Sequence, residues 1–412
     1  MRFLHTSDWH LGQTLHSFER THEHQCFLDW LLDTIATEQA EGLLISGDIF
    51  DNANPSAASQ KQLYRFLQQA KIRVPHLNII IIAGNHDSPG RLEAPGPLLE
   101  EFDTTVVGQI RRTADGNIDL NQLVIPLRNR DGAISAWCMA IPFLRPGDVP
   151  RIETEGDAYM EGIAEIYRQA LELALAHRQP GQAILALGHC HMAGGEVSAE
   201  SERRIVIGGA EALSATIFDP AIAYAALGHL HRAQRVGKQE HLRYCGSPLP
   251  LSFAEIDYTH QILRVDLDGE SVQSITTIPV PRAVELMRIP KQPAPVEEVL
   301  AQLAALDLPA QSDMHSHPYL EVRVRLDSPE PSLRARVEAA LENKPVRLAK
   351  IETSVAHKIS GEVAPMSLDD LNRLQPEDIF QRLYQSRFGN TAPPEQLAAF
   401  AELLINPTES AA

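Results

Sequence analysis

Short apolar runs alternate with helical patterns over the first 280 residues of the chain. Between the early runs, residues 21–40 and 55–70 carry apolar side chains at helical spacing, and Pro55 suits the start of the second helix. Strands that alternate with helices predict an α/β sheet with helices packed on its faces. The runs rich in Ile, Leu, Val and Ala have the length of buried strands, and they cover residues 1–6, 42–46, 78–83, 182–187 and 222–227.

The pattern changes twice further along the chain. Apolar and polar positions alternate between Gly and Pro turns over residues 242–280, which is typical of strands. A small α+β domain is expected next, with strands near 284–289, 319–326 and 346–351 and helices near 296–306 and 332–342. From Pro365 onward the chain is helical, with helices at 376–388 and 393–405. We therefore expect three domains, at residues 1–280, 281–360 and 361–412.

Length and composition agree with a globular protein of several domains. A chain of 412 residues is too long for one core of ordinary size, and 44% hydrophobic with 22% charged residues is a globular balance. No apolar run approaches the roughly 20 residues that span a bilayer, and a polar motif at residues 5–12 leaves no room for a secretory signal. Four scattered cysteines without paired spacing indicate reduced thiols in a cytoplasm.

The net charge of −18 counts against a nucleic-acid-binding protein, because such proteins usually carry a basic face. If this chain binds DNA, bulk charge cannot provide the attraction. Bound metal ions, a local basic patch or a partner subunit would have to do so.

Candidate chemistry lies at the ends of the apolar runs, where open α/β sheets place their sites. Residues two apart in an extended segment point the same way, so Asp8 can converge with His10 on one ion, as can the two histidines of the last motif. The mixed oxygen and nitrogen donors suit Mn²⁺, Fe²⁺ or Zn²⁺ and are too rich in nitrogen for a dedicated Ca²⁺ or Mg²⁺ cage. One such motif is weak evidence, but five in this order predict a metal site: Asp8-Trp9-His10, Gly47-Asp48-Ile49-Phe50-Asp51, Gly84-Asn85-His86-Asp87, Gly188-His189 and Gly228-His229-Leu230-His231.

The order of these motifs resembles the calcineurin-like metallophosphoesterase superfamily. Within it, three stretches are similar to the SbcD nuclease family: residues 5–12 (His-Thr-Ser-Asp-Trp-His-Leu-Gly), residues 84–88 and Tyr244-Cys245-Gly246-Ser247-Pro248. The resemblance implies a four-layer αββα sandwich, with two sheets flanked by helices, as the nuclease domain. A small α+β capping domain and a helical, partner-binding C-terminal tail would follow it.

The resemblance also implies two divalent metal ions. It favours Mn²⁺, whereas the ligand types alone allow iron equally. Ions about 3.5–4 Å apart can clamp a phosphodiester, generate hydroxide at neutral pH and stabilise the leaving oxygen. In the implied ligand set Asp48 bridges the ions, one held by Asp8, His10, Asp48 and His231 and the other by Asp48, Asn85, His189 and His229.

Further residues near these motifs have open roles. The family places the counterpart of His86 on the scissile phosphate, where a histidine can protonate the leaving oxygen near neutral pH; the alternative is a hydrogen bond within its loop. Asp51 stands where archaeal and eukaryotic relatives carry a second histidine, and it either supports His86 with its charge or only shapes the turn. His191 imitates the ligand pattern, but the family takes only His189 from that segment, so His191 is left out. His16 either faces DNA or is ordinary solvated surface.

As to function, the resemblance implies an Mn²⁺-dependent DNA nuclease, a 3′ to 5′ exonuclease on duplex ends and an endonuclease on hairpins or single strands. It would act with an SbcC-type ATPase, two copies of each, in DNA repair, replication and recombination, in the bacterial cytoplasm and at the nucleoid; a homodimer is also considered. The alternatives are a nucleotide phosphoesterase, which would not need the domains after residue 281, and a docking scaffold for the ATPase, which would not need an intact ligand set.

The C-terminal tail is the expected docking element for the ATPase. An apolar stripe at helical spacing with large aromatic rings is typical of an interface. The family resemblance implies that the ATPase receives it near the base of its coiled coil. The alternative is that the helices fold back on residues 285–355 as ordinary core. The stripe consists of Ile379, Phe380, Leu383, Tyr384 and Phe388.

Overall fold

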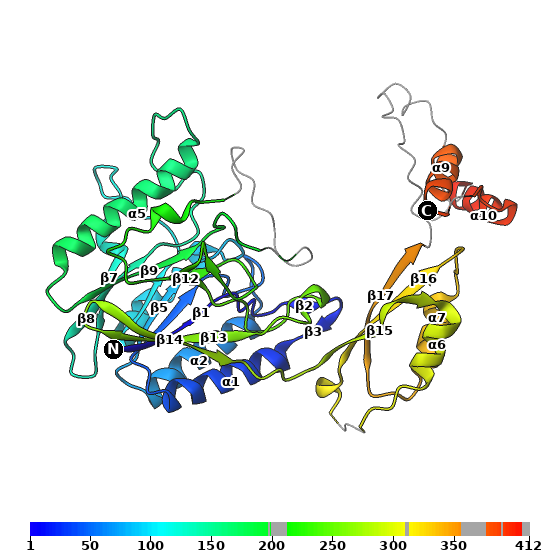
Figure 1. Cartoon of the computed structure of the whole chain (residues 1–412), viewed down its shortest axis with the longest axis horizontal. Coiled ribbons are helices and arrows are strands. Elements are labelled where there is room, and N and C mark those ends of the chain that lie inside the picture. The colour runs from blue at the N-terminus through cyan, green and yellow to red at the C-terminus, as the bar shows by residue number, and fades with distance from the viewer. Residues whose placement is uncertain (197, 199–211, 310–312, 356–375, 389, 406–412) are drawn as a thin grey trace, which may run out of the picture. The chain divides into compact units, whose positions relative to one another are not determined.

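Two six-stranded sheets form the centre of the unit Met1–Ala283 in the computed structural model (Figure 1). The structure describes the whole chain except residues 197, 199–211, 310–312, 356–375, 389 and 406–412. The first sheet has the order β14-β13-β1-β4-β5-β6, with parallel strands β1 (Arg2–Thr6), β4 (Gly42–Ser46), β5 (Asn78–Ile82) and β6 (Thr104–Val107) and antiparallel strands β13 (Gln261–Asp268) and β14 (Ser271–Pro279).

The second sheet has the order β11-β12-β10-β9-β8-β7. Its four middle strands are parallel, and its two edge strands are antiparallel to their neighbours. The strands are β7 (Val124–Arg128), β8 (Ile134–Ala140), β9 (Ala183–His189), β10 (Tyr224–Gly228), β11 (Gln234–Val236) and β12 (Gln239–Tyr244).

Strand β5 explains why the sheets stack. Successive side chains of a strand point to opposite faces, and all of Ile79 to Ile82 are buried. Ile80 and Ile82 join the core that includes the second sheet, whereas Ile79 and Ile81 join the core under the helices. A strand buried on both faces therefore reads as a continuous apolar run.

Helices cover both outer faces of the paired sheets. Helices α1 (Thr21–Thr37) and α2 (Ala57–Arg73) pack on the first sheet, and α5 (Ala158–His177) packs on the second (Figure 1). The four-layer αββα sandwich expected from the sequence is confirmed. The remaining strands and α-helices described in this unit are short: β2 (Thr14–Leu15), β3 (Phe18–Glu19), α3 (Pro89–Glu93) and α4 (Gly96–Leu99).

The start of α2 corrects one expectation. Pro55 precedes the helix and does not begin it, because Ser56 is the N-cap and its side-chain oxygen accepts the Ser59 amide at 3.1 Å. A capping serine satisfies an amide that the first helical turn leaves without a partner. Strands β6, β7 and β8 and helix α5 were not predicted from the sequence.

The second compact unit runs from Val284 and contains a three-stranded parallel sheet. Each pair of neighbouring strands is joined through a helix whose apolar side chains cover one face of the sheet. Its elements are β15 (Leu286–Pro295), α6 (Val296–Ala304), β16 (Tyr319–Leu326), α7 (Leu333–Ala340) and β17 (Arg347–Val355), followed by α9 (Pro376–Phe388) and α10 (Pro394–Ile405). The expected division at 360/361 lies outside the described residues, so a separate tail domain stays a prediction. Among the described helices, none is long and apolar enough to cross a membrane.

Candidate metal centre

The motifs meet because they follow parallel strands of two sheets that face each other. Asp8 and Asp48 follow β1 and β4 of the first sheet, while His189 ends β9 and His229 follows β10 of the second. The two sheets are joined close to the motifs, where the Ser46 hydroxyl donates to the Ala226 carbonyl at 2.9 Å. Segments 180 positions apart in the sequence are thereby brought to one edge.

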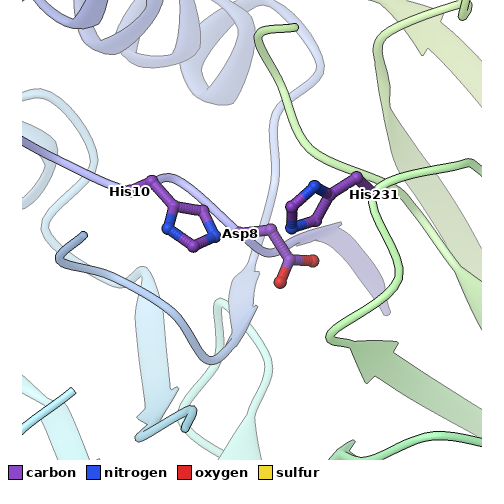
Figure 2. Close-up of side chains that lie close together, drawn as sticks. All are labelled: Asp8, His10 and His231. Atoms are coloured by element: carbon purple, nitrogen blue, oxygen red, sulfur yellow. The ribbon is translucent and has the colours of Figure 1, made fainter. Parts of the chain in front are cut away.

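The first half of the site consists of Asp8, His10 and His231. Their potential ligand atoms lie within 4.8 Å of one another, and all three side chains are buried. Figure 2 shows the Asp8 carboxylate and the rings of His10 and His231 close together. Asp8 also accepts the His229 amide at 3.0 Å, which ties the loop after β10 to the loop after β1.

These side chains converge through strained backbone and not through the extended segment expected from the sequence. Asp8 and His10 have φ of 54° and 46°, and Asp48 and His229 have φ of 50° and 102°. Left-handed backbone at a residue other than glycine costs of the order of 1–3 kcal/mol and persists where the surrounding structure fixes it. Here the amides of Asp8 and His10 donate to the carbonyls of Gly47 and Asp48, each at 3.0 Å.

Asp48 lies between the two halves of the site. Its Oδ2 atom is 3.6 Å from Nε2 of His10 and 3.4 Å from Nε2 of His189, while Oδ1 accepts the His86 amide at 2.9 Å. Burial opposes ionisation of this carboxyl, but the charges of His189 and His10 lower its pKa overall. One oxygen that faces both sides is the geometry a bridging ligand needs.

The second half of the site consists of Asn85, His189 and His229. Oδ1 of Asn85 lies 3.0 Å from Nε2 of His189 and 3.1 Å from Nδ1 of His229. Nδ1 of His189 donates to the Ser46 carbonyl at 2.8 Å, which leaves Nε2 on the side of the site. Burial, together with the charge of His189, lowers the pKa of His229, so that its ring is neutral and can bind a cation.

Two glycines allow the backbone to pass close to neighbouring residues of the site. A Cβ at Gly84 would collide with the Asp48 carboxylate, and a Cβ at Gly228 would collide with the Ser46 carbonyl. The backbone of both motifs therefore passes closer to its neighbours than any residue with a side chain allows.

His86 lies at the open side of this cluster. Its ring is half-buried, 4.8 Å from the ring of His10, and belongs to a group of potential ligands with His10 and Asp48. Nδ1 of His86 donates to the backbone carbonyl of Asp51 at 2.7 Å, whereas Oδ1 of Asp51 lies 3.5 Å from Nδ1 of His10. Asp51 thus contacts His86 through its backbone and His10 through its side chain.

Comparison with known proteins decides the family. The calcineurin-like phosphoesterase family model matches residues 1–233, and the model described as the type 5 capsule protein repressor C-terminal domain matches residues 282–388. The SbcD chain of the nuclease SbcCD from Rhodobacter capsulatus is 40% identical over 92% of this chain and 93% of its own length. The chain belongs to the SbcD nuclease family. The corresponding chains of Escherichia coli K12 (32% identical, 93% of this chain, 92% of the relative) and Bacillus subtilis 168 (34%, 65% and 66%) are also similar.

Membership makes this SbcD family chain a metal-dependent phosphodiesterase, and the residues present fit divalent ions. Nε2 of His10 is buried and has no hydrogen-bond partner within the described part of the chain. A buried polar atom of this kind costs free energy unless something binds it. The carboxylate, carboxamide and imidazole donors suit first-row transition metals.

The structure connects two further carboxylates to the site: Asp87, which belongs to the third motif but not to the implied ligand set, and Glu255, which lies outside all five motifs. Asp87 accepts the amides of Ile49, Phe50 and Gly84 at 2.9–3.1 Å and so joins the loops after β4 and β5; burial and the Asp48 charge raise its pKa to about 6. Glu255 accepts a hydrogen bond from Nδ1 of His231 at 2.9 Å. Glu255 lies 24 residues beyond the last motif, so no local spacing could have signalled it.

Two other histidines had open roles in the sequence analysis. The ring of His191 is half-buried, 6.2 Å from that of His229, and it belongs to none of the candidate ligand groups found among the described residues. His16 is exposed in the turn between β2 and β3, and its ring lies 5.9 Å from that of Phe253. Neither distance assigns a role.

The apolar stripe on α9 divides into two parts. The rings of Phe380, Tyr384 and Phe388 pack along one side at centroid distances of 6.1 and 4.8 Å, and Phe380 stacks on Phe400 of α10 at 4.4 Å. Ile379 and Leu383 are 39% and 63% exposed. Phe380 thus joins the two helices to each other, and the two aliphatic side chains are exposed.

Proposed function

We propose that this chain is the nuclease component of a complex with an SbcC-type ATPase and that it hydrolyses DNA phosphodiester bonds with two bound Mn²⁺ ions. The position of Asp48 carries the proposal, since its Oδ2 lies 3.6 Å from His10 and 3.4 Å from His189. Asp8, His10, Asp48 and His231 would hold one ion, and Asp48, Asn85, His189 and His229 the other. When bound, the ions would supply Lewis acidity, a hydroxide nucleophile at neutral pH and a clamp on the phosphate.

His86 acts on the leaving oxygen. Its Nδ1 donates to the Asp51 carbonyl at 2.7 Å, which holds the ring and keeps a proton on Nδ1, because a carbonyl can only accept. In the cationic ring Nε2 carries the second proton, and it is the nitrogen that can deliver a proton to the leaving oxygen. The carboxylate of Asp51 acts on the site through His10, 3.5 Å away.

A basic hollow beside the metal centre suits the phosphate backbone of DNA. It begins at Arg232, the residue after ligand His231, and measures about 630 Å³. Its charged lining includes four basic side chains and two acidic ones: Arg232, Arg235, Lys238, Arg243, Glu196 and Asp257. Arg232 pairs with Glu196, and Arg235 and Arg243 pair with Glu240, so DNA phosphates would exchange with these carboxylates as partners of the basic side chains. Such phosphate contacts supply most non-specific DNA affinity and would offset the net charge of −18 locally.

The ATPase docks on the outward side of α9. Ile379 and Leu383 expose aliphatic surface one turn apart, while the neighbouring rings fix α9 against α10. An amphipathic helix that exposes such residues suits contact with a groove or a coiled coil. In this assignment Phe380, Tyr384 and Phe388 shape the docking element, and the two aliphatic residues contact the partner.

A second copy of this chain covers an apolar groove between α2 and the segment from α4 to β6. The groove measures about 900 Å³ and exposes Ile72, Leu98 and Phe102 by 63%, 72% and 57%. Contiguous apolar surface of this kind is unusual on a monomer and marks an interface. The groove supports a homodimer. With one ATPase docked on each tail, the complex has two copies of each protein. It acts in the bacterial cytoplasm and at the nucleoid, in DNA repair, replication and recombination.

The test uses the purified chain with Mn²⁺, with and without the ATPase and ATP. The substrates are linear duplex DNA labelled at either end, hairpin DNA and a chromogenic phosphodiester. We expect 3′ to 5′ degradation of the duplex and cutting of the hairpin, both removed by a chelator. Activity on the chromogenic ester or on nucleotides without any on DNA would favour a small-molecule phosphoesterase, and no activity with full ATPase binding would favour a scaffold.

A further inference from the structure

His231 makes a second contact that fixes how its ring faces the site. Nδ1 of His231 lies 2.9 Å from Oε1 of Glu255, and both side chains are buried, at 3% and 0% exposure. A carboxylate can only accept, so this nitrogen carries the proton. Nε2 is then the nitrogen with a lone pair, and the ring belongs to the cluster with Asp8 and His10.

Glu255 is itself held by the backbone. Its other oxygen, Oε2, accepts the Leu251 amide at 2.7 Å, and Glu255 ends a short 3₁₀ turn (Phe253–Glu255) capped by the Ser252 hydroxyl, which accepts the Ala254 amide at 3.2 Å. Both acceptor atoms are therefore used by donors in fixed positions.

The segment that carries Glu255 is clamped to the beginning of the chain. The Leu251 carbonyl accepts from the Gln13 carboxamide at 3.0 Å, and the Pro250 carbonyl accepts from the Arg20 guanidinium at 2.7 Å. Arg20 also donates to the Gln13 carboxamide and to both oxygens of Glu23, at 2.6–3.0 Å. Arg20 is fully buried, and a buried guanidinium in such a bidentate pair is a rigid anchor.

The same segment also contacts the backbone of His231. The Ser247 amide donates to the His231 carbonyl at 3.0 Å. Gly246, at φ 80°, passes so close that a Cβ would lie 2.6 Å from that carbonyl. One loop thus fixes both the main chain and the ring of a candidate ligand.

We infer that Glu255 is a positioning residue of the metal centre, which sets the tautomer and orientation of His231 and strengthens its Nε2 as a ligand. The inference deepens the proposed function and rests on it. Carboxylates bonded to the far nitrogen of a ligand histidine typically affect metal affinity about 10–100-fold when they are changed. Gln cannot replace Glu255, because it has one accepting atom where His231 and Leu251 both donate.

The experiment measures Mn²⁺ binding by titration calorimetry on the full chain, for wild type, Glu255→Gln and Glu255→Ala. We expect one of two Mn²⁺ ions to bind about 10–100-fold more weakly in both variants. Glu93→Gln is the matched control, since Glu93 is a buried carboxylate that also accepts a backbone amide, from Gly108 at 2.7 Å. It should bind both ions as wild type does.

A double-mutant cycle separates positioning from general stability. In a His231→Ala background, Glu255→Gln should weaken Mn²⁺ binding no further, because the group it acts through is gone. An equal loss in both backgrounds, or wild-type binding by Glu255→Gln, overturns the inference. Absence of Mn²⁺ binding by the wild-type chain would instead overturn the proposed function.

A spectroscopic measurement needs no substitution at Glu255. With ¹⁵N-labelled histidine and diamagnetic Zn²⁺ bound, long-range ¹H–¹⁵N correlations of His231 should show the proton on Nδ1 and the metal on Nε2. His231→Ala identifies the signal. Metal on Nδ1, or no metal on this ring, overturns the inference even if the Glu255 variants do not fold.

Discussion

The backbone carbonyl of Asp51 accepts a hydrogen bond from Nδ1 of His86 at 2.7 Å. The carboxylate of the same residue lies 3.5 Å from Nδ1 of His10. Asp51 thus connects the proposed proton donor, His86, with a proposed metal ligand, His10, by two different groups. Substitutions that change only one of these groups can separate their effects.

Substitutions of His86 and Asp48 are expected to have different effects on metal binding and cleavage. His86→Gln should keep both Mn²⁺ ions and lose about 10²–10⁴-fold in cleavage rate, the usual contribution of a general acid. Asp48→Asn should lose bound metal, because the shared oxygen loses its charge. Metal content is measured by mass spectrometry together with the DNA cleavage rate. Equal metal loss in the two variants would contradict the assignment of His86 as the proton donor.

Asp51→Asn keeps the carbonyl that holds His86 and removes the charge near His10. We expect Mn²⁺ binding to weaken severalfold and the alkaline limb of the pH–rate profile to stay at the same pH as in wild type. A stabilising carboxylate raises the pKa of a histidine, so a limb that moves to lower pH would assign the Asp51 charge to His86 instead. The profile is measured at saturating Mn²⁺ so that the two effects do not mix.

Removal of the outward aliphatic side chains of α9 should prevent docking of the ATPase. Ile379→Ser with Leu383→Ser, like deletion of residues 366–412, is expected to abolish co-purification while Mn²⁺ binding and basal phosphodiesterase activity stay intact. Gln381→Ala, at an exposed position of the same helix, is the control. Full binding by the double variant would exclude this face, and an insoluble truncated chain would favour the alternative that the helices are core.

The groove between α2 and α4 should set the oligomeric state. Leu98→Glu with Phe102→Glu places charge in the apolar surface, so light scattering should report a dimer for wild type and a monomer for the variant. Leu175→Glu changes an exposed apolar residue on α5, 39% exposed, and should leave the mass unchanged. A wild-type chain that is monomeric at high concentration would remove the homodimer from the proposed function.

Acid should destabilise the first unit through His24. This ring is fully buried, neither nitrogen has a hydrogen-bond partner among the described residues, and burial, then the Arg20 charge, lowers its pKa from 6.5 to about 3. Below pH 6.5 the His24 ring binds a proton in the unfolded chain but not in the folded chain. The contribution of neutral His24 to the free energy of unfolding is therefore fully present above pH 6.5 and is lost as the pH falls toward 3.

At pH 5 the loss attributable to His24 is about 2 kcal/mol. His24→Leu, measured by urea unfolding of chelator-treated protein, should narrow the difference in stability between pH 7 and pH 5 by that amount. His76→Leu, at an exposed position, should not. An unchanged difference in the His24 variant would show that its ring is protonated in the folded state.

The sequence by itself determined the elements whose signal is local. Residues 42–46 and the start of β5 were recognised because their side chains are apolar on both faces, and α9 has the predicted bounds of 376–388. The motif order was also sufficient for the family, because each motif is a short segment read directly from neighbouring residues. Neither required knowledge of the fold.

Only the tertiary structure decided which atoms meet. Asp48 and His189 lie on different sheets, and the distance between them depends on how the sheets stack. Glu255 contacts His231 from a loop that Arg20 holds in place through the Pro250 carbonyl. Arg20 and Pro250 are 230 positions apart, so no local pattern in the sequence signals this arrangement. The backbone carbonyl of Asp51 was equally hidden, because every residue has one and only the folded chain selects which is used.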